Sequence, residues 1–349
     1  MQTYDLNWEP LRTYCQKLFQ TQGVPEDEAF LVADCLVEAD LCGIDSHGIA
    51  RVDIYLKRLE EKVVNPVCEL KIEQEHAASL AINACNSMGI VTGRRVMEKC
   101  IEKARQSGSC FATVNNSNHY CRGYHYIKMA AAEGMIGFTL SNTTPQMTPW
   151  GGCEKFLGTN PIGVAAPTND GPIILDIASS VVAIGKITLA GRLGQSIPEG
   201  WTLTPDGEPT TDPIVGAKGS LLPFGGPKGS GIAVFVEIFC GILAGAQYGP
   251  YVNNFLSNFK DPQGLGQVFS CIDISKFVPL ETFKERLGQM IKEMKALRKI
   301  PGVTEIFMPG EIEWKRELER RAKGTVPVPE PVYNTLKQLG EKYGVPFDF

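Results

Sequence analysis

The spacing of apolar residues predicts helices at both ends of the chain. In the N-terminal part these helices are expected over 8–21, 25–41, 43–62 and 89–107. Within the 43–62 segment, apolar side chains recur at steps of three and four at Ile49, Val52, Leu56 and Leu59. Towards the C-terminus the predicted helices cover 232–246, 281–299, 309–324 and 329–344. The 232–246 run is apolar except for Glu237, so we expect that helix to be buried.

Between these helices the pattern changes to short runs that are typical of strands. We expect strands over 79–85, 110–116, 135–142, 162–168, 172–178 and 267–275. A turn-rich arm over 191–218 is expected to wrap the surface. The pattern predicts an α/β fold of α+β-like character, with a helical N-terminal part (1–70), a mixed-sheet core (71–300) and a helical C-terminal tail (301–349).

Composition narrows the classes of partner. The 349 residues carry a net charge of -5, which leaves no basic surface for nucleic acid or for an anionic membrane. No apolar run is long enough to cross a bilayer. Eleven cysteines without a C-x-x-C pair indicate reduced thiols in a cytoplasmic protein. With four histidines and no H-E-x-x-H motif or Cys/His cluster, no metal site is predicted.

The first candidate for chemistry is Ser46-His47-Gly48, followed by Arg51 and Tyr55. Ser46 stands where the N-cap of the predicted helix belongs, and His47 then falls in its first turn. Positions 47, 51 and 55 step by four, so an imidazole, a guanidinium and a phenol share roughly one face. A guanidinium can clamp a carboxylate, and an imidazole can transfer protons. The pattern suits a small keto or hydroxy acid, and it suits equally a capped helix with a surface Arg51 and a core Tyr55.

The second candidate is the glycine-rich segment FGGPKGSG, residues 224–231. No G-x-G-x-x-G follows an early strand, so a Rossmann domain is not predicted. The segment does feed a helix N-terminus and places Lys228 beside it, which is a general cradle for a pyrophosphate. Glycines that merely permit a tight turn explain the segment equally well.

The third candidate is 115–126, NNSNHYCRGYHY, which directly follows a predicted strand, where active-site loops are common. His119 is a second candidate for proton transfer, whereas His125 is expected on a helix face. Further along the chain, Thr143 and Thr159 are neutral hydrogen-bonding groups suited to a ribose or a carboxamide. Ordinary polar turns are the competing account of both segments.

In their order along the chain, these motifs resemble the malate/L-lactate dehydrogenase family of the second type. These are non-Rossmann NAD(P)-dependent reductases that also include ureidoglycolate dehydrogenase and 2,3-diketo-L-gulonate reductase. The resemblance rests on GIDSHGIAR, NSNHYCRGY, PWGGCEKFLGTNPIGVAAP, ILDIASSVVAIGK, LLPFGGPKGSG and PGE, and it covers nearly the whole chain.

The resemblance implies a homodimer with its active site between domains, and NAD or NADP held in a mixed-sheet domain between the helical N- and C-terminal parts. It makes His47 and His119 the two candidates for acid–base catalysis. The cofactor contacts that it implies are Thr143, Asp176, Ile177, Ala178, Lys228, Gly229, Pro309, Gly310 and Glu311.

Three positions depart from the usual pattern of the family. Many members have His where Pro227 stands, Tyr where Ser230 stands, and Arg or Lys where Cys153 stands. Lys-Gly-Ser-Gly together with Arg122 is similar to the diketogulonate reductases, whereas Pro-Lys-Gly also occurs in relatives like ureidoglycolate dehydrogenase. The reaction class follows from the resemblance, and the substrate stays open.

The leading hypothesis is a reversible reduction of a 2-oxo acid to a 2-hydroxy acid, most simply in the malate or lactate pair. Arg51 would hold the carboxylate, and His47 would donate a proton to the carbonyl oxygen. The other side chains expected around the substrate are Ser46, Tyr55, Thr159 and His119. Ureidoglycolate and 2,3-diketo-L-gulonate are alternative substrates, and an inactive NAD-binding protein is the alternative from another class. A serine hydrolase, suggested by Ser46 beside His47, lacks the G-x-S-x-G elbow.

Overall fold

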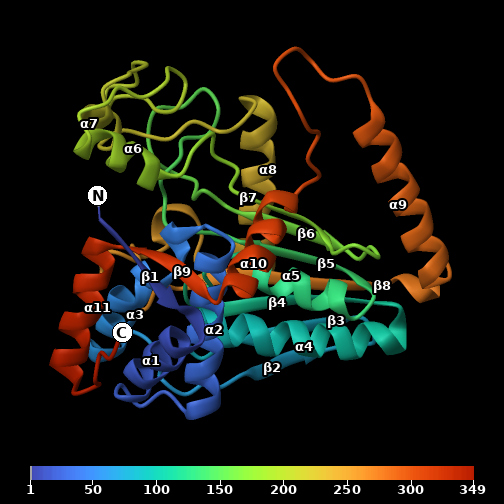
Figure 1. The fold of residues 1–349 in the computed structure, drawn as a ribbon, viewed down its shortest axis with the longest axis horizontal. Helices are drawn as coiled ribbons and strands as arrows, with labels where there is room; N and C mark the ends of the chain where they lie inside the picture. Colours follow the sequence, from blue (N-terminus) through green and yellow to red (C-terminus); the bar gives the residue numbers. More distant parts are fainter. Residues whose placement is uncertain (1) are drawn as a thin grey trace.

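A seven-stranded mixed sheet forms the centre of the molecule, whose computed structural model describes residues 2–349 (Figure 1). Its strands are β2 (Lys71–Glu75), β3 (Ser79–Asn83), β4 (Ser109–Ser117), β5 (Met135–Ser141), β6 (Ile162–Ala166), β7 (Ile173–Ile177) and β8 (Leu265–Asp273). The strand order is β2-β3-β4-β8-β5-β6-β7, and only β3 and β4 run parallel. The mixed sheet expected from the alternating runs is confirmed. The strand β2 was not expected, because its residues are all exposed and show no alternation.

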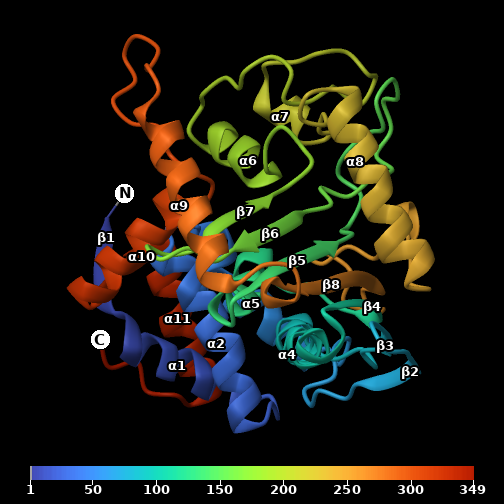
Figure 2. The same cartoon turned by 90° about the vertical axis from the view of Figure 1, so that its right-hand side faces the viewer.

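Helices cover both faces of this sheet. The helices α4 (Gly89–Ser107) and α5 (Gly123–Ala132) pack on one face, below the sheet in Figure 2. The helix α8 (Pro227–Glu237) and the π-helix Ile238–Leu243 that continues it lie against the other face. Along β8 the side chains divide accordingly, since Phe269 joins the cluster beneath α4 while Val268 packs against Val236.

The N- and C-terminal segments pack together beside the sheet. This bundle contains α1 (Trp8–Gln20), α2 (Glu26–Leu41), α3 (Val52–Glu60), α11 (Glu330–Tyr343) and the antiparallel pair β1 (Thr3–Asn7) and β9 (Thr325–Pro329). One hydrophobic core joins Leu36 and Leu56 to Val326 and Leu336. The remaining helices are α6 (Ile184–Arg192), α7 (Pro213–Gly216), α9 (Leu280–Ala296) and α10 (Glu311–Lys323). The division at residues 70 and 300 stays a prediction.

The helix expected over 43–62 is broken, and that prediction was wrong. Two 3-10 turns, Asp45–His47 and Ile49–Arg51, precede α3. The cause is Asp40, whose Oδ2 accepts the backbone N–H of Ile49 at 2.8 Å. Between the turns Gly48 is extended, and a Cβ at this position would lie 2.1 Å from Asp40 Oδ1. Glycine is therefore needed for the close approach of the carboxyl group of Asp40, and Ser46 is not the N-cap of an α-helix.

The helix expected over 232–246 also differs from the prediction. It begins earlier, at Pro227, because Gly226 has a φ of 63° and Pro227 fits the first helical position. It is not fully buried, since Phe235 is 61% exposed and Ile242 59% exposed. No helix in the described part of the chain is long and apolar enough to span a bilayer.

Candidate active site

The first 3-10 turn presents His47 at its end, partly exposed. Its Nδ1 lies 3.0 Å from Ser46 Oγ. The Nε of Arg51 donates to the carbonyl oxygen of Ser46 at 2.7 Å, so the guanidinium folds back over this turn. Burial lowers the pKa of His47 to about 3, and the charges of Arg51 and Arg122 act in the same direction. The imidazole of His47 is therefore neutral at neutral pH.

The loop after β4 positions His119 through its backbone. The N–H of His119 donates to Gln263 Oε1 at 2.9 Å, and the carbonyl of Asn118 accepts from Gln267 Nε2 at 2.9 Å. Burial lowers the pKa of His119 well below its usual range, with further contributions from neighbouring cations. This imidazole is neutral as well, and its place is fixed by β8 and the loop before it.

The two histidines converge although they come from different elements. Their ring centroids lie 6.0 Å apart at an interplanar angle of 25°. The hydroxyl of Tyr55, on α3, lies 2.6 Å from His119 Nδ1. Cys121 joins the two segments, because its thiol donates to the carbonyl oxygen of His47 at 3.1 Å. The structure thus brings together His47, Tyr55 and His119. The single helical face expected for positions 47, 51 and 55 does not form, because 47 and 51 lie in separate 3-10 turns before α3.

Sequence reasoning missed Phe255, which closes one side of this group. Its ring stacks on His119 with centroids 4.6 Å apart, and it meets Tyr55 edge-on at 5.4 Å. Phe255 belongs to an irregular segment between the η4 turn Gly249–Tyr251 and β8. No motif or periodicity marks it, so the sequence alone carries no signal for it.

The residues expected at the cofactor form a connected strip next to this group. The N–H of Thr159 donates to Thr143 Oγ1 at 2.9 Å, and the N–H of Ser179, next to Ala178, donates to the carbonyl of Thr159 at 2.8 Å. The hydroxyl of Thr144 in turn donates to the carbonyl oxygen of Asn253 at 3.1 Å. The strip is thereby tied to the segment that carries the ring stacked on His119.

The N-terminus of α8 borders the same strip. The N–H of Phe224 donates to the carbonyl of Ser179 at 3.0 Å, which holds the start of the glycine-rich segment against the end of β7. No side chain caps this helix, Lys228 is exposed, and a Cβ at Gly229 would lie 2.1 Å from the carbonyl oxygen of Phe224. Because the N–H of Gly229 already donates to the carbonyl of Phe224 at 3.1 Å, the groups here that fit a phosphate are the backbone N–H and the exposed ammonium of Lys228. These features agree with a dinucleotide in this strip.

Two acidic side chains in the strip are already engaged. Asp176 Oδ2 accepts the N–H of Tyr124 at 2.9 Å, so its carboxylate caps the start of α5. Glu311 accepts the N–H of Met308 at 2.9 Å and the ammonium of Lys295 at 2.5 Å. The carboxylate of Glu311 therefore occupies the start of α10, so this helix N-terminus is not an open phosphate cradle.

The backbone around these acids is closely packed. The carbonyl of Pro309 accepts the N–H of Ile174 at 3.0 Å, and a Cβ at Gly310 would lie 2.5 Å from the carbonyl oxygen of Ile174. The side chain of Ile177, at the end of β7, is 39% exposed. This part of the strip offers backbone and an apolar surface to a ligand rather than carboxylates.

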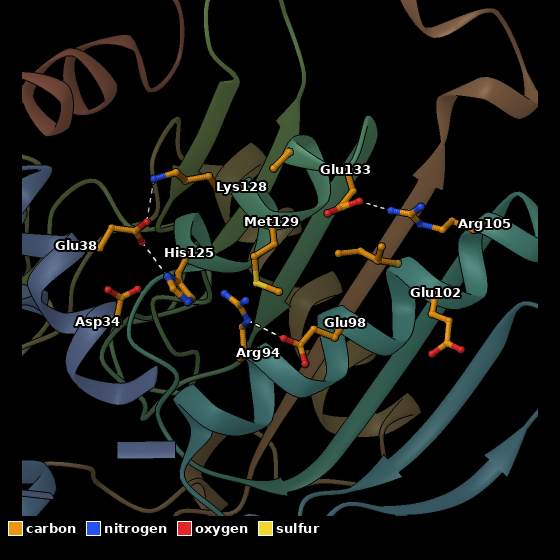
Figure 3. A pocket seen from close by; sticks show the side chains of 12 residues that line it. Asp34, Glu38, Arg94, Glu98, Glu102, Arg105, His125, Lys128, Met129 and Glu133 are labelled. Atoms are coloured by element: carbon orange, nitrogen blue, oxygen red, sulfur yellow. Dashed lines mark hydrogen bonds and ion pairs between the residues drawn. The ribbon is translucent and has the colours of Figure 1, made fainter. Parts of the chain in front are cut away.

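A separate group of charges lies between α2, α4 and α5, around a cavity of about 620 Å³ whose lining includes neither of the paired histidines (Figure 3). At one end of the cavity Glu38 contacts His125 Nδ1 at 2.9 Å and Lys128 Nζ at 2.9 Å. Arg122 lies 3.7 Å from the same carboxylate. The helical position expected for His125 is correct, and the residue belongs to this network rather than to the candidate active site.

Comparison with known proteins agrees with this geometry. A profile of the family described as malate/L-lactate dehydrogenase matches residues 6–337. Malate dehydrogenase from Pyrococcus horikoshii is 39% identical over 343 residues, covering 96% of this chain and 94% of the relative. Ureidoglycolate dehydrogenase (NAD(+)) from Escherichia coli K12 is 31% identical, covering 90% of this chain and 89% of the relative. The solved structure of sulfolactate dehydrogenase from Methanocaldococcus jannaschii superposes with a TM-score of 0.92 at 36% identity, covering 98% of each chain.

A mixed sheet with paired neutral histidines and an uncapped helix N-terminus, in a chain whose relatives oxidise hydroxyl groups of hydroxy acids, defines a dehydrogenase with a nicotinamide cofactor. The fold is shared along the whole chain with such enzymes. The chain belongs to the malate/L-lactate dehydrogenase family. The resemblance identified from the sequence motifs is confirmed.

Proposed function

We propose that this chain interconverts a 2-oxo acid and a 2-hydroxy acid, with malate and oxaloacetate as the first pair and lactate and pyruvate as the second. The proposal rests on one observation: the ring centroids of His47 and His119 lie 6.0 Å apart, next to the turn that carries Arg51. Two neutral imidazoles can hydrogen-bond a carbonyl or hydroxyl oxygen, and the guanidinium can bind the adjacent carboxylate. A nicotinamide cofactor supplies or accepts the hydride when it is bound.

Each residue has a role in this proposal. Arg51 holds the carboxylate, while His47 and His119 contact the oxygen that gains or loses a proton. Tyr55 and Ser46 hydrogen-bond to one histidine each, and they orient the two rings. Thr159, whose N–H donates to Thr143 Oγ1, is proposed to contact the substrate.

NAD is the proposed cofactor, with NADP as the alternative outcome. The backbone N–H and the ammonium of Lys228, at the start of α8, would hold the pyrophosphate. The other residues proposed to contact the dinucleotide are Thr143, Asp176, Ile177, Ala178, Gly229, Pro309, Gly310 and Glu311. Because Asp176 and Glu311 already bind backbone N–H groups, we assign them mainly to shaping the strip.

The substrate alternatives differ in what the structure offers them. Arg122, the feature shared with diketogulonate reductases, is 7% exposed and lies next to Glu38 and Cys42. Arg122 is therefore not available to bind a sugar acid, which favours malate over 2,3-diketo-L-gulonate as the substrate. Sulfolactate carries an anionic group where malate has its second carboxylate, so we add it to the candidates because of the relative with that name.

The test is the loss of NADH absorbance with oxaloacetate, pyruvate, 3-sulfopyruvate and 2,3-diketo-L-gulonate, repeated with NADPH. Ureidoglycolate and NAD are assayed in the oxidative direction. We expect the highest kcat/KM with oxaloacetate and NADH. A higher value for another acid would replace malate by that substrate. Binding of NADH without turnover of any acid would instead support the inactive cofactor-binding protein.

A homodimer is part of the proposal. The outer face of α8 and of the π-helix after it exposes Phe235, Ile242 and Leu243 at 57–61%. The helix α9 has no buried residue, and it stands away from the sheet in Figure 1. Apolar surfaces of this kind on a globular protein mark association sites. The cytoplasmic location expected from the cysteines also remains part of this proposal.

Light scattering tests the dimer. We expect a mass of about twice 38.1 kDa for the wild type. Phe235→Asp should shift the population towards the monomer, whereas Lys260→Asp, a change at an exposed loop position, should not. A wild type that is monomeric at all concentrations would contradict the dimer.

A further inference from the structure

A buried arginine without a counter-ion lies beneath the candidate active site. Arg58 is 1% exposed, and only its Nη1 is engaged, donating to the carbonyl oxygens of Phe255 at 3.1 Å and Asn258 at 2.8 Å. Its Nε and Nη2 have no hydrogen-bond partner. Among residues 2–349 no carboxylate lies within ion-pair distance of this guanidinium. A buried, uncompensated charge is costly, so its presence calls for a function.

The position of Arg58 points to that function. Arg58 and Tyr55 are three residues apart on α3 and share one face of the helix. The guanidinium carbon of Arg58 lies 5.4 Å from the centre of the Phe255 ring, which stacks on His119. The positive charge therefore lies against the ring that stacks on His119, and it comes from the same helix as Tyr55.

The hydrogen bonds determine where the protons of this pair are. Burial raises the pKa of Tyr55 well above its usual range, so its hydroxyl carries a proton and can donate to His119 Nδ1. The backbone N–H of Cys121 also points to the same nitrogen at 3.4 Å. With donors on Nδ1, the neutral imidazole of His119 carries its proton on Nε2. That N–H is the group available to a substrate oxygen.

We propose that Tyr55 and His119 form a proton relay, and that Arg58 is the positioning residue whose charge stabilises the tyrosinate that the relay leaves behind. This inference rests on the proposed function. During reduction the substrate oxygen takes the proton of His119 Nε2 as the carbonyl carbon gains hydride. His119 Nδ1 takes the hydroxyl proton of Tyr55 in the same step. The imidazole ends neutral with its proton on Nδ1, and Tyr55 becomes an anion. To restore the resting state, Tyr55 takes the proton back from Nδ1 and Nε2 receives a proton from water.

The relay explains why no carboxylate pairs with Arg58. A permanent counter-ion would neutralise the guanidinium and leave nothing to attract the tyrosinate. Here the positive charge is unbalanced while Tyr55 is protonated, and it becomes balanced when the proton leaves. Arg51 and Arg58 both act to lower the pKa of Tyr55, against the effect of burial. In the oxidative direction the same steps run in reverse, and the tyrosinate accepts the proton.

Kinetics of four variants test the relay. Tyr55→Phe should lower kcat for reduction by about 10² or more with little change in KM, because only the proton source is lost. Arg58→Met should lower kcat about 10- to 100-fold, and Arg58→Lys should restore most of it. Lys57→Met removes a cation from the exposed side of the same helix and should leave kcat unchanged.

The pH profile separates the relay from a merely structural role. Because the pKa of Tyr55 lies well above its usual range, the rate of oxidation should still be rising with pH at the alkaline end of the accessible range. Arg58→Met should shift this rise by about one pH unit to higher pH, seen as an about tenfold lower rate at each alkaline pH, and Tyr55→Phe should abolish the rise. A Tyr55→Phe variant with wild-type kcat would overturn the relay and leave His47 as the proton donor. So would an Arg58→Met variant that loses activity without any shift of the profile.

NMR of His119 needs no substrate turnover, so it tests the relay independently of the proposed function. In protein labelled with ¹⁵N-histidine, the signal missing from His119→Gln identifies His119, and its nitrogen shifts report the tautomer. We expect the proton on Nε2 in the wild type, and a proton on Nδ1 would contradict the relay. If the wild type reduces no 2-oxo acid, the proposed function fails. The tautomer and a spectroscopic titration of tyrosinate in Arg58→Met still decide whether Arg58 acts on Tyr55.

Discussion

Two buried arginines in this protein have opposite surroundings. Arg122 is 7% exposed and lies 3.7 Å from a Glu38 oxygen, with its guanidinium carbon 4.8 Å from the centre of the Tyr124 ring. Arg58 is 1% exposed and has only carbonyl oxygens and the ring of Phe255 as partners. The charge of Arg122 is balanced in the resting protein, whereas we propose that the charge of Arg58 is balanced only during the reaction. A buried charge thus serves structure when it is paired and chemistry when it is not.

Glu38 is the centre of the paired region. It accepts from His125 and from Lys128 at 2.9 Å each (Figure 3). Lys128 also contacts Glu317 at 2.7 Å. Although burial acts to raise it, the pKa of Glu38 lies well below its usual range because His125, Lys128 and Arg122 favour the carboxylate. These contacts connect α2, α5 and α10, so the network holds three helices in place.

The largest effect is expected in the unpaired region, which comprises Arg58 and the pair formed by Tyr55 and His119. His119→Ala removes the group that the relay needs, and turnover should fall by about 10² to 10⁴. Steady-state kinetics with the best substrate of the wild type measure the loss, and circular dichroism checks the fold. His125→Ala, the matched change in the paired region, should retain most of the turnover of the folded protein. Equal losses of turnover in the two variants would contradict the assignment of catalysis to His119 rather than to the network around Glu38.

The next effect concerns the paired region. Glu38→Gln leaves several buried cations without their carboxylate, and the free energy of unfolding should fall by about 3–5 kcal/mol. Urea denaturation measures this change. Glu98→Gln, which removes the exposed partner of Arg94 on the rim of the same cavity, should cost less than about 1 kcal/mol. A Glu38→Gln variant as stable as the wild type would show that the network does not hold the helices.

The sequence predicts some features of the fold and of the candidate site and misses others. The strands β3 to β8 and the long helix α4 followed from periodicity, because the alternation and the helical repeat reflect burial on one face. His47 and His119 were found because they lie in motifs. The break in the helix at Gly48 was not predicted, because it depends on the carboxyl group of Asp40, which reaches the turn only in the folded chain. Phe255 was missed for the same reason, since an irregular segment carries no pattern.

The pairing of β1 with β9 shows the same limit. These strands come from opposite ends of the chain, and the register places Tyr4 opposite Val328. Two prolines in β9 argue against a strand when the sequence is considered alone. The edge position of β9 in a two-stranded sheet tolerates them, and that position is known only from the tertiary structure.

Asp40, which accepts the N–H of Ile49 behind the turn that carries His47, makes the stability of the protein depend on pH. Burial raises its pKa from 3.8 to about 8, so the folded protein keeps a proton that the unfolded chain releases. Between these values the free energy of unfolding should therefore fall as the pH rises, by at most about 1.4 kcal/mol per pH unit. Asp40→Asn keeps a carbonyl oxygen for the N–H of Ile49 and should remove this contribution. Urea denaturation at several pH values measures both slopes, and identical slopes would contradict the raised pKa.

The smallest expected effect compares the two arginines directly. Arg122→Met removes a charged partner of Glu38 and should lower the free energy of unfolding by about 1.5–3 kcal/mol. Arg58→Met removes an uncompensated buried charge, and the gain in desolvation should offset the lost hydrogen bonds to Phe255 and Asn258, so stability should change by less than about 1 kcal/mol. Urea denaturation of both variants at one pH measures the difference. If Arg58→Met were the more destabilising change, Arg58 would be a structural residue and its missing counter-ion would have no catalytic meaning.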